Sequence, residues 1–221
     1  MNQGTAFTEK DKILSQLKVW KINFSYLFQL AVLFLLYFIN AQIGLKIDSI
    51  NTFAARYWPP TAIALAAALL FGMKIWPGIW LAAFSANLWS RAPLFAAFGI
   101  ALGNTAEALV GTYLLTQVFD FKRSFRRIRD VFQFFGITLF VSCPLSASIG
   151  ILSLSLTGGV AAGSFFHSWL TWWIGDSLGA EIFTPLILLI VKKSRVLLYS
   201  STSPRNTRAP KPRFHHFLFN I

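Results

Sequence analysis

The sequence has few charged residues, few acids and almost no cysteine. Charged residues make up 13% of the 221 residues, Asp and Glu together number 8, and the one cysteine is Cys143. A single cysteine excludes a disulfide within the chain. Its position in an apolar run beside Pro144 favours a small buried side chain over a redox switch.

Convincing catalytic signatures are missing as well. The sequence contains no His-x-x-Glu-His and no pair of carboxylates at a spacing convincing for catalysis. Its one Gly-x-Ser-x-Gly match, Gly175 to Gly179, lies within a long apolar run and not at the strand-to-helix turn that a nucleophilic serine of this motif occupies. His215 and His216 are adjacent, but they lack the convergent partners that a metal site needs. We therefore expect a protein that is not an enzyme and that binds neither a cofactor nor a metal.

Apolar residues are abundant. They make up 55% of the chain, and the mean hydropathy of +0.58 predicts an integral membrane protein. The net charge of +12 could suggest nucleic acid, but the basic residues lie in short segments beside apolar runs. Anionic lipid attracts each such residue by about 1 kcal/mol, so we expect the lipid bilayer, and not nucleic acid, as the partner.

The stretch Arg56–Trp89 organises the chain. Trp58-Pro59-Pro60 and Trp76-Pro77 mark two helix starts, because proline is tolerated in the first helical turn. The apolar runs that follow, 60–71 and 75–89, are shorter than the ~20 residues of a perpendicular membrane span. They predict a buried helical hairpin, made either of two short spans or of a re-entrant pair of broken helices.

Four longer apolar runs surround this hairpin, so the sequence predicts an all-α, polytopic helical bundle with about six membrane segments. We expect a cytoplasmic N-terminal segment at 1–23, an integral membrane domain at 24–195, and a basic, disordered tail at 196–221. The long runs are Phe24 to Leu45, Leu94 to Phe119, Val131 to Leu156 with a bend at Cys143-Pro144, and one within Ala161 to Val191.

The distribution of basic residues predicts the orientation. With six crossings and a cytoplasmic N-terminus, all but three of the 20 Lys and Arg residues fall on the cytoplasmic side, the exceptions being Lys46, Arg56 and Arg91. Cytoplasmic loops carry this excess in membrane proteins. Both termini are therefore expected in the cytoplasm. A hairpin that re-enters without crossing gives the same outer loops, so the rule does not separate the two forms.

Polar residues at membrane depth are expensive and mark functional sites by default. The clearest are Glu107, Asp176 and Glu181, together with Asn87 and Asn104. Asn104 and Glu107 are three residues apart and share one helix face. Asp176 and Glu181 are separated by about 140° around a helix and do not share a face.

No Lys or Arg occurs in the spans that carry these acids. Two interpretations stay open: a protonated carboxyl or amide that joins helices by hydrogen bonds, or a ligand or ion site inside the bundle. The candidate ligand, ion or helix-coupling site comprises Trp58, Pro59, Pro60, Trp76, Pro77, Asn87, Asn104, Glu107, Asp176 and Glu181.

Several short motifs carry a resemblance that covers roughly Phe24 to Val191. They are Trp58-Pro59-Pro60-Thr61, Phe71-Gly72, Trp76-Pro77-Gly78, Ala86-Asn87, Asn104 with Glu107, and Trp172-Trp173-x-Gly175-Asp176-x-x-Gly179 with Thr184-Pro185. This set resembles the first family of bacterial membrane-associated sensor domains. The resemblance implies a multi-span sensor in the bacterial inner membrane, placed N-terminal to an output such as a histidine kinase or a cyclic-di-GMP enzyme.

The sequence departs from that pattern because it contains no Gly-Gly-Asp-Glu-Phe stretch, no phospho-accepting histidine segment and no nucleotide-binding loop. We expect a sensory input module that binds an unknown small ligand. It would be either a truncated or frameshifted product, or a module that acts as a homo-oligomer or through a separate output protein in two-component or cyclic-di-GMP signalling. A small ion-coupled membrane transporter is the alternative, since carriers also use broken helices and mid-membrane carboxylates.

Overall fold

A computed structural model of the chain describes residues 24–47, 49–50, 54–55 and 57–202. The expected N-terminal segment at 1–23 and residues 203–221 of the expected tail lie outside this part. The chain divides into two compact units, Met1–Leu188 and Leu189–Ile221. All packing described below belongs to the first unit.

The described part is mainly helical, as the composition predicts. Two strands of two residues each, β1 (Ser49–Ile50) and β2 (Ala54–Ala55), pair antiparallel after the first helix. The helices are α2 (Phe24–Ile47), α3 (Pro59–Phe71), α4 (Trp76–Trp89), α5 (Leu94–Tyr113), α6 (Ile128–Ile137), α7 (Cys143–Leu156) and α8 (Phe165–Thr202), with short 3-10 turns at Met73–Ile75 and Ala162–Ser164 and π-helical turns at Leu114–Val118 and Thr138–Ser142.

Within the described residues, four helical segments are long and apolar enough to cross a membrane: Phe24–Lys46, Leu94–Val118, Ile128–Leu156 and Phe165–Ser194. The third joins α6 and α7 through the π-helical turn. The helix α3 has 13 residues, which corresponds to a length of about 20 Å. The prediction of a polytopic helical bundle with a short Trp-Pro hairpin is confirmed.

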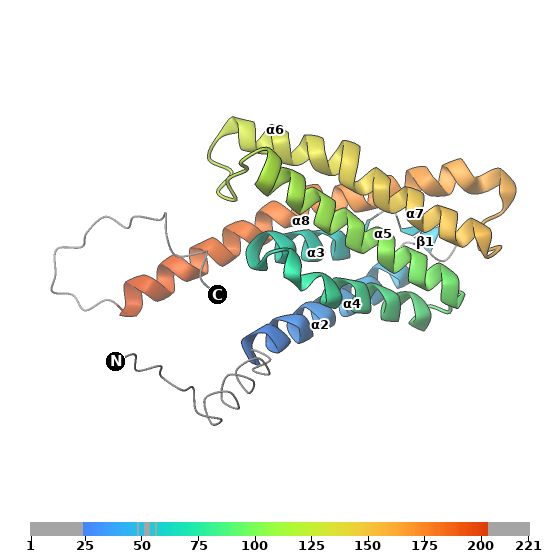
Figure 1. Cartoon of the computed structure of the whole chain (residues 1–221), viewed down its shortest axis with the longest axis horizontal. Helices are drawn as coiled ribbons and strands as arrows, with labels where there is room; N and C mark the ends of the chain where they lie inside the picture. The colour runs from blue at the N-terminus through green and yellow to red at the C-terminus, as the bar shows by residue number, and fades with distance from the viewer. Residues whose placement is uncertain (1–23, 48, 51–53, 56, 203–221) are drawn as a thin grey trace, which may run out of the picture. The chain divides into compact units, whose positions relative to one another are not determined.

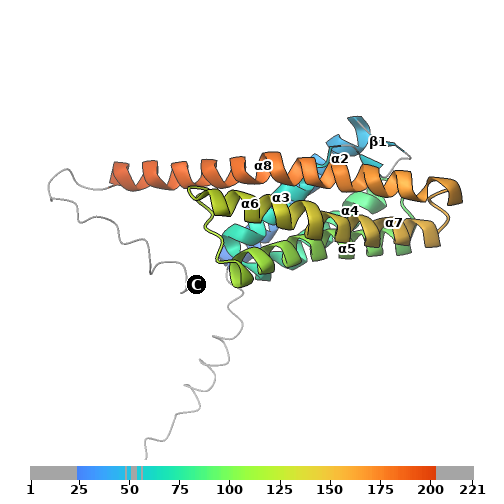
Figure 2. The same cartoon turned by 90° about the horizontal axis from the view of Figure 1, so that it is seen from above.

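Successive segments of the first unit run in alternating directions (Figure 1, Figure 2). The start of α2, the turn between α3 and α4, and the loop from α5 to α6 lie at one end of the bundle (Figure 1). At this end the Tyr26 hydroxyl donates a hydrogen bond to the carbonyl of Lys74 over 2.8 Å. The short hairpin therefore turns back at the end that also holds the basic loop, as the alternation of charged loops predicts.

Proline and glycine set the helix boundaries. Proline occupies the first turns of α3 and of α4, as predicted. Gly72 follows α3 with a φ of 86°, a backbone conformation that side chains disfavour. Pro144 lacks an N–H and would clash inside a regular helix. The π-helical turn at Thr138–Ser142 directly precedes it, and π-bulges are an identifiable cause of helix kinks.

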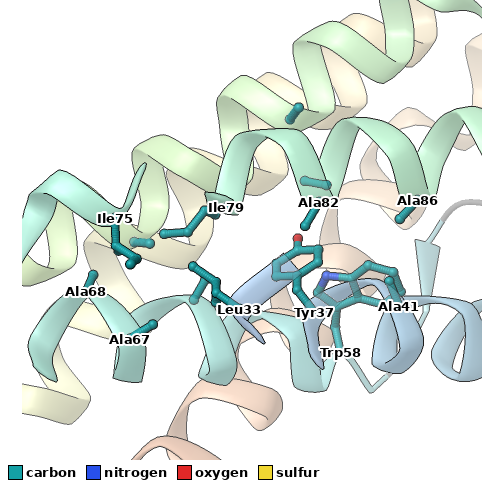
Figure 3. Close-up of a cluster of buried hydrophobic side chains, with 14 of the residues drawn as sticks. Leu33, Tyr37, Ala41, Trp58, Ala67, Ala68, Ile75, Ile79, Ala82 and Ala86 are labelled. Atoms are coloured by element: carbon teal, nitrogen blue, oxygen red, sulfur yellow. The ribbon is translucent and has the colours of Figure 1, made fainter. Parts of the chain in front are cut away.

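The first helix of the hairpin, α3, is buried, as predicted, whereas α4 has an exposed face that includes Trp76, Leu81 and Trp89. Small residues let α3 approach its neighbours closely, and five alanines of this helix are among its buried residues: Ala62, Ala64, Ala66, Ala67 and Ala68. Leu33 and Tyr37 of α2 pack with Ile75 and Ile79 at the centre of a cluster that includes several of these alanines (Figure 3).

The outer surface of the bundle is strongly apolar. Large side chains on four helices point outward, among them Phe28, Phe95, Phe132, Phe140 and Ile182. A surface of this kind is far more apolar than that of a water-soluble monomer. It suits contact with lipid acyl chains.

One boundary differs from the expectation. We expected a disordered tail from 196 onward, but α8 continues to Thr202. Residues 196–199 are Val-Leu-Leu-Tyr, and the next proline comes only at Pro204, so nothing in the local sequence stops the helix.

Candidate functional site

The start of α3 is inserted against α8, and this contact defines the site. The backbone N–H of Trp58 donates to the carbonyl of Gly175 over 3.1 Å. The carbonyl of Trp58 lies so close to Gly179 that a side chain there would overlap it. Gly175 and Gly179 of α8 thus make a close contact with the residue that opens α3.

The two prolines solve a problem that this insertion creates. A helix N-terminus normally leaves four backbone N–H groups without intrahelical partners, and each costs free energy when buried. Pro59 and Pro60 have no N–H, and the N–H of Thr61 donates to the carbonyl of Trp58 over 3.3 Å. With Trp58 bonded to α8, the first turn of α3 contains no orphan backbone donor.

Thr61 stands between two buried carboxyl groups from different helices. Its Oγ1 lies 3.3 Å from Oε2 of Glu107 on α5 and 3.1 Å from Oδ1 of Asp176 on α8. Glu107 is 2% exposed and Asp176 is 1% exposed. Oε1 of Glu107 and Oδ2 of Asp176 are buried without a hydrogen-bond partner among the described residues. The first turn of α3 therefore joins two acids that lie far apart in the sequence.

A second polar network adjoins the first and is centred on Asn104. The Asn104 amide donates to the hydroxyl of Tyr37 on α2 over 2.8 Å. Its carbonyl oxygen accepts from the hydroxyl of Ser146 on α7 over 2.9 Å. The Ser146 side chain also lies against the carboxyl groups of Glu107 and Asp176, so the two networks connect α2, α3, α5, α7 and α8.

Further polar side chains complete the surroundings of the carboxyl groups. The thiol of Cys143 lies against Glu107 and also against Ser177. The indole of Trp172 lies against Asp176. Ser177 is 4% exposed and its hydroxyl has no hydrogen-bond partner among the described residues. The site therefore holds more polar atoms than the described side chains satisfy.

Charge at the site is one-sided. No Lys or Arg occurs in α3, α5 or α7, in α2 before Lys46, or in α8 before Lys192. The positive end of the α3 dipole is the remaining favourable electrostatic contribution, since α3 begins at this point. No group of three His, Cys, Asp or Glu residues capable of holding a metal ion occurs in the part of the chain that the structure describes.

The structure brings together Trp58, Pro59, Pro60, Asn104, Glu107 and Asp176 from the predicted set. Asn104 and Glu107 share a buried face of α5, as their spacing predicts. Trp58 is 7% exposed and packs against Gly44, so it is a buried residue. Its indole lies beside Tyr37 (Figure 3).

Four predicted residues lie apart from this cluster. Trp76 is 49% exposed and, with Pro77, opens α4. The amide of Asn87 is buried but bonds locally to the carbonyl of Ala83 over 2.8 Å. Glu181 is partly exposed. These residues therefore shape or flank the bundle, whereas the cluster around Thr61 is the candidate site.

Sequence reasoning missed Thr61, Tyr37, Ser146 and Trp172 as site residues. Thr61 directly follows Pro59-Pro60, so its position in the first turn of a buried helix was a usable signal. Tyr37 lies in the middle of an apolar span, where a hydroxyl needs a partner. Trp172 is 5% exposed and packs on Gly150 of α7, so it belongs to the interior of the bundle.

The fold and the site define a polytopic membrane protein with a buried acidic centre. The family model of MASE1, a membrane-associated sensor domain, matches residues 29–216, and the chain belongs to this family. The match extends past Val191, where the resemblance of the short motifs ends. Neither the curated proteins nor the solved structures that were searched gave a match to the chain.

Proposed function

We propose that this chain is a non-enzymatic sensory input module of bacterial signal transduction, in which a small ligand or a membrane state acts on the buried cluster around Thr61. It would work as a homo-oligomer or through a separate output protein, of the histidine kinase or cyclic-di-GMP type. The family match supports the sensor role, and the buried carboxyl groups support a site to which a stimulus is directed.

The observation that carries this proposal is the contact at which Thr61 of α3 meets Glu107 of α5 and Asp176 of α8, which we call the joint. Two carboxyl groups are held by one hydroxyl on the first turn of a short helix. A stimulus shifts a protein between two arrangements only by interacting differently with each of them. The joint contains buried polar atoms without hydrogen-bond partners among the described residues. A stimulus that changes the charge there would change the relative free energies of the two helix arrangements.

The same helix that carries Asp176 continues to Thr202, and a basic cluster, Lys192-Lys193-Ser194-Arg195, lies on it. We place both termini in the cytoplasm and the chain in the inner membrane, because the positive-inside rule favours this orientation. Alkaline phosphatase, which is active only outside the cytoplasm, should be inactive when fused after Arg195 and active when inserted after Gly158. The reverse pattern would contradict the proposed orientation.

The sensor role is tested by joining a diguanylate cyclase to the end of the chain and measuring cyclic-di-GMP in cells. Glu107→Gln and Asp176→Asn should change the amount of product relative to the unmodified fusion, because each alters the joint. Glu181→Gln is the matched control, since it removes an acid of α8 outside the cluster, and it should leave the product level unchanged. Equal output from all four fusions at equal expression would count against the sensor role.

A further inference from the structure

We propose that Glu107, Thr61 and Asp176 together bind one exchangeable proton, which holds the first turn of α3 between α5 and α8. Both carboxyl groups are buried, and each has one oxygen next to Thr61 and one oxygen without a partner among the described residues. The hydroxyl of Ser177, which is also buried and has no hydrogen-bond partner in the part of the chain that the structure describes, lies beside the Cys143 thiol that touches Glu107.

The number of hydrogens at the joint requires this proton. A threonine hydroxyl has one hydrogen to donate, whereas an ionised carboxylate can only accept. Thr61 is within hydrogen-bond distance of both acids, so it can donate to one of them only. The other carboxyl group completes its bond only if it is protonated and donates to the oxygen of Thr61.

The neighbouring Ser146 supplies no further hydrogen to the two acids. Its hydroxyl hydrogen is used in the bond to the carbonyl oxygen of Asn104, because the amide of Asn104 is directed to Tyr37. Towards Glu107 and Asp176, Ser146 is therefore left with lone pairs only. The two hydroxyl groups therefore supply one hydrogen between them. The indole of Trp172 at Asp176 and the thiol of Cys143 at Glu107 are further donors, but a donor to one acid does not supply the hydrogen that the second acid needs for its bond with Thr61.

Charge gives an independent reason. An unpaired buried carboxylate is strongly unfavourable, and two of them repel each other. The other titratable groups that face the pair are Tyr37 from α2 and Cys143 from α7, and neither supplies a positive charge; α3 and α4 contain no titratable residue. One bound proton leaves a single negative charge, which faces the positive end of the α3 dipole.

Loss of this proton would place two like charges on opposite sides of Thr61. The turn would then keep its backbone bond from Trp58 to Gly175 but lose one of its two side-chain bonds. This inference rests on the proposed function in one respect: in a sensor, the proton would be the ligand that shifts α3 relative to α5 and α8.

Infrared difference spectroscopy of the full chain in lipid nanodiscs tests the proton directly. At neutral pH the unmodified protein should show the C=O stretching band of one buried protonated carboxyl group, and the band should disappear as the pH rises. Glu107→Gln and Asp176→Asn should each lose the band at neutral pH, because the amide donates to Thr61 in place of the acid. Glu181→Gln should keep it.

Thermal unfolding of the same samples gives a second measurement. A proton bound by the folded state stabilises it where the proton is present, so the melting temperature of the unmodified protein should fall as the pH rises through the loss of the band. The two amide variants should lose this fall, and each is informative if the other does not fold. Glu181→Gln should keep this fall.

Three results would overturn the proposal: no protonated-carboxyl band in the unmodified protein at acid or neutral pH, loss of the band in Glu181→Gln, or loss of the band on adding sodium at constant pH. The last result would mean that a metal cation occupies the site. None of these measurements depends on an output domain. A missing proton with an active cyclase fusion would refute this inference alone, and a bound proton with an unresponsive fusion would refute only the sensor role.

Discussion

The carbonyl oxygen of Trp58 occupies the space that a side chain at Gly179 would need. This contact seats the first turn of α3 on α8, and it is the reason that Thr61 reaches Asp176. A methyl group at Gly179 would meet backbone atoms, which cannot rotate away as a flexible side chain can. The glycine therefore sets the distance between the two helices.

Gly179→Ala should consequently push α3 off α8 and destabilise the bundle. Overpacking of a close contact costs about 1–3 kcal/mol, and we expect the free energy of unfolding in mixed detergent micelles to fall by that amount. Gly136→Ala is the matched control, because a Cβ at this helical glycine meets nothing within 4 Å. It should be neutral or stabilising by about 0.5–1 kcal/mol. Equal effects of the two changes would contradict the close contact.

The Asn104 network makes a prediction about a single hydroxyl. Tyr37→Phe removes the oxygen that accepts from the Asn104 amide and leaves a buried N–H unsatisfied. Hydrogen bonds between membrane helices contribute about 1 kcal/mol each, so this loss of unfolding free energy is expected. Tyr26→Phe is the control. It removes a hydroxyl whose bond to the Lys74 carbonyl is exposed, and its effect should stay within about 0.5 kcal/mol.

The network also predicts that these effects are coupled. Ser146→Ala removes the other partner of Asn104, so the effects of Tyr37→Phe and Ser146→Ala should not be additive. Once Asn104 is replaced by Ala, neither change should retain its full effect. Additive effects in all backgrounds would mean that Asn104 does not join α2 to α7.

How much of this arrangement the sequence predicts depends on the kind of signal. Apolar run lengths and prolines locate the helices, and the scarcity of acids in the spans singles out Glu107 and Asp176. Their meeting at Thr61 could not be predicted, because the three residues are separated by 46 and 115 positions along the chain. Hydrogen-bond partners at such separations are decided by helix packing and not by local pattern.

Asn87 and Glu181 illustrate the opposite error. Both are polar residues in apolar segments, so composition alone ranked them with Asn104. Asn87 instead satisfies its amide on its own helix through the carbonyl of Ala83, and Glu181 is partly exposed. A polar residue in a span marks a shared site only when its own helix cannot satisfy it and its face points inward, and the second condition needs the fold.

The basic loop between α5 and α6 is predicted to respond to acid. The hydrogen bond from Lys122 holds the pKa of Asp120 below its ordinary value, with smaller effects of Lys122 and Arg127 charge. A depressed folded-state pKa contributes stability above the unfolded value, and this contribution is lost as the pH falls through the folded value. The protection factors of the amides in residues 119–127, which are corrected for the intrinsic pH dependence of hydrogen exchange, should therefore fall at low pH. Unchanged protection factors would contradict the contribution of this pair.

Asp130 should matter more to the same loop than Asp120. It is fully buried, accepts two bonds from Arg127, the longer of them 2.9 Å, and accepts the backbone N–H of Lys122. Asp130→Asn places an amide donor against the guanidinium and should cost about 1.5–3 kcal/mol. Asp120→Asn, at an exposed acid, should change unfolding by less than about 0.5 kcal/mol. Hydrogen exchange of the loop in both variants, at neutral pH, provides the comparison.

Cys143 offers a direct probe of whether the joint opens. Its side chain is fully buried against Glu107 and Ser177. It is the one cysteine of the chain, so a maleimide has a single target. A buried thiol reacts only when the surrounding helices separate, because the reagent must reach the sulfur. The unmodified protein should label slowly, and a cysteine introduced by Arg126→Cys in the exposed loop should label rapidly.

The same labelling tests the contact between α3 and α8. If Gly179→Ala loosens α3 from α8, labelling of Cys143 should accelerate in that variant and not in Gly136→Ala. Rapid labelling of the unmodified protein would mean that the helices around Cys143 are not closed.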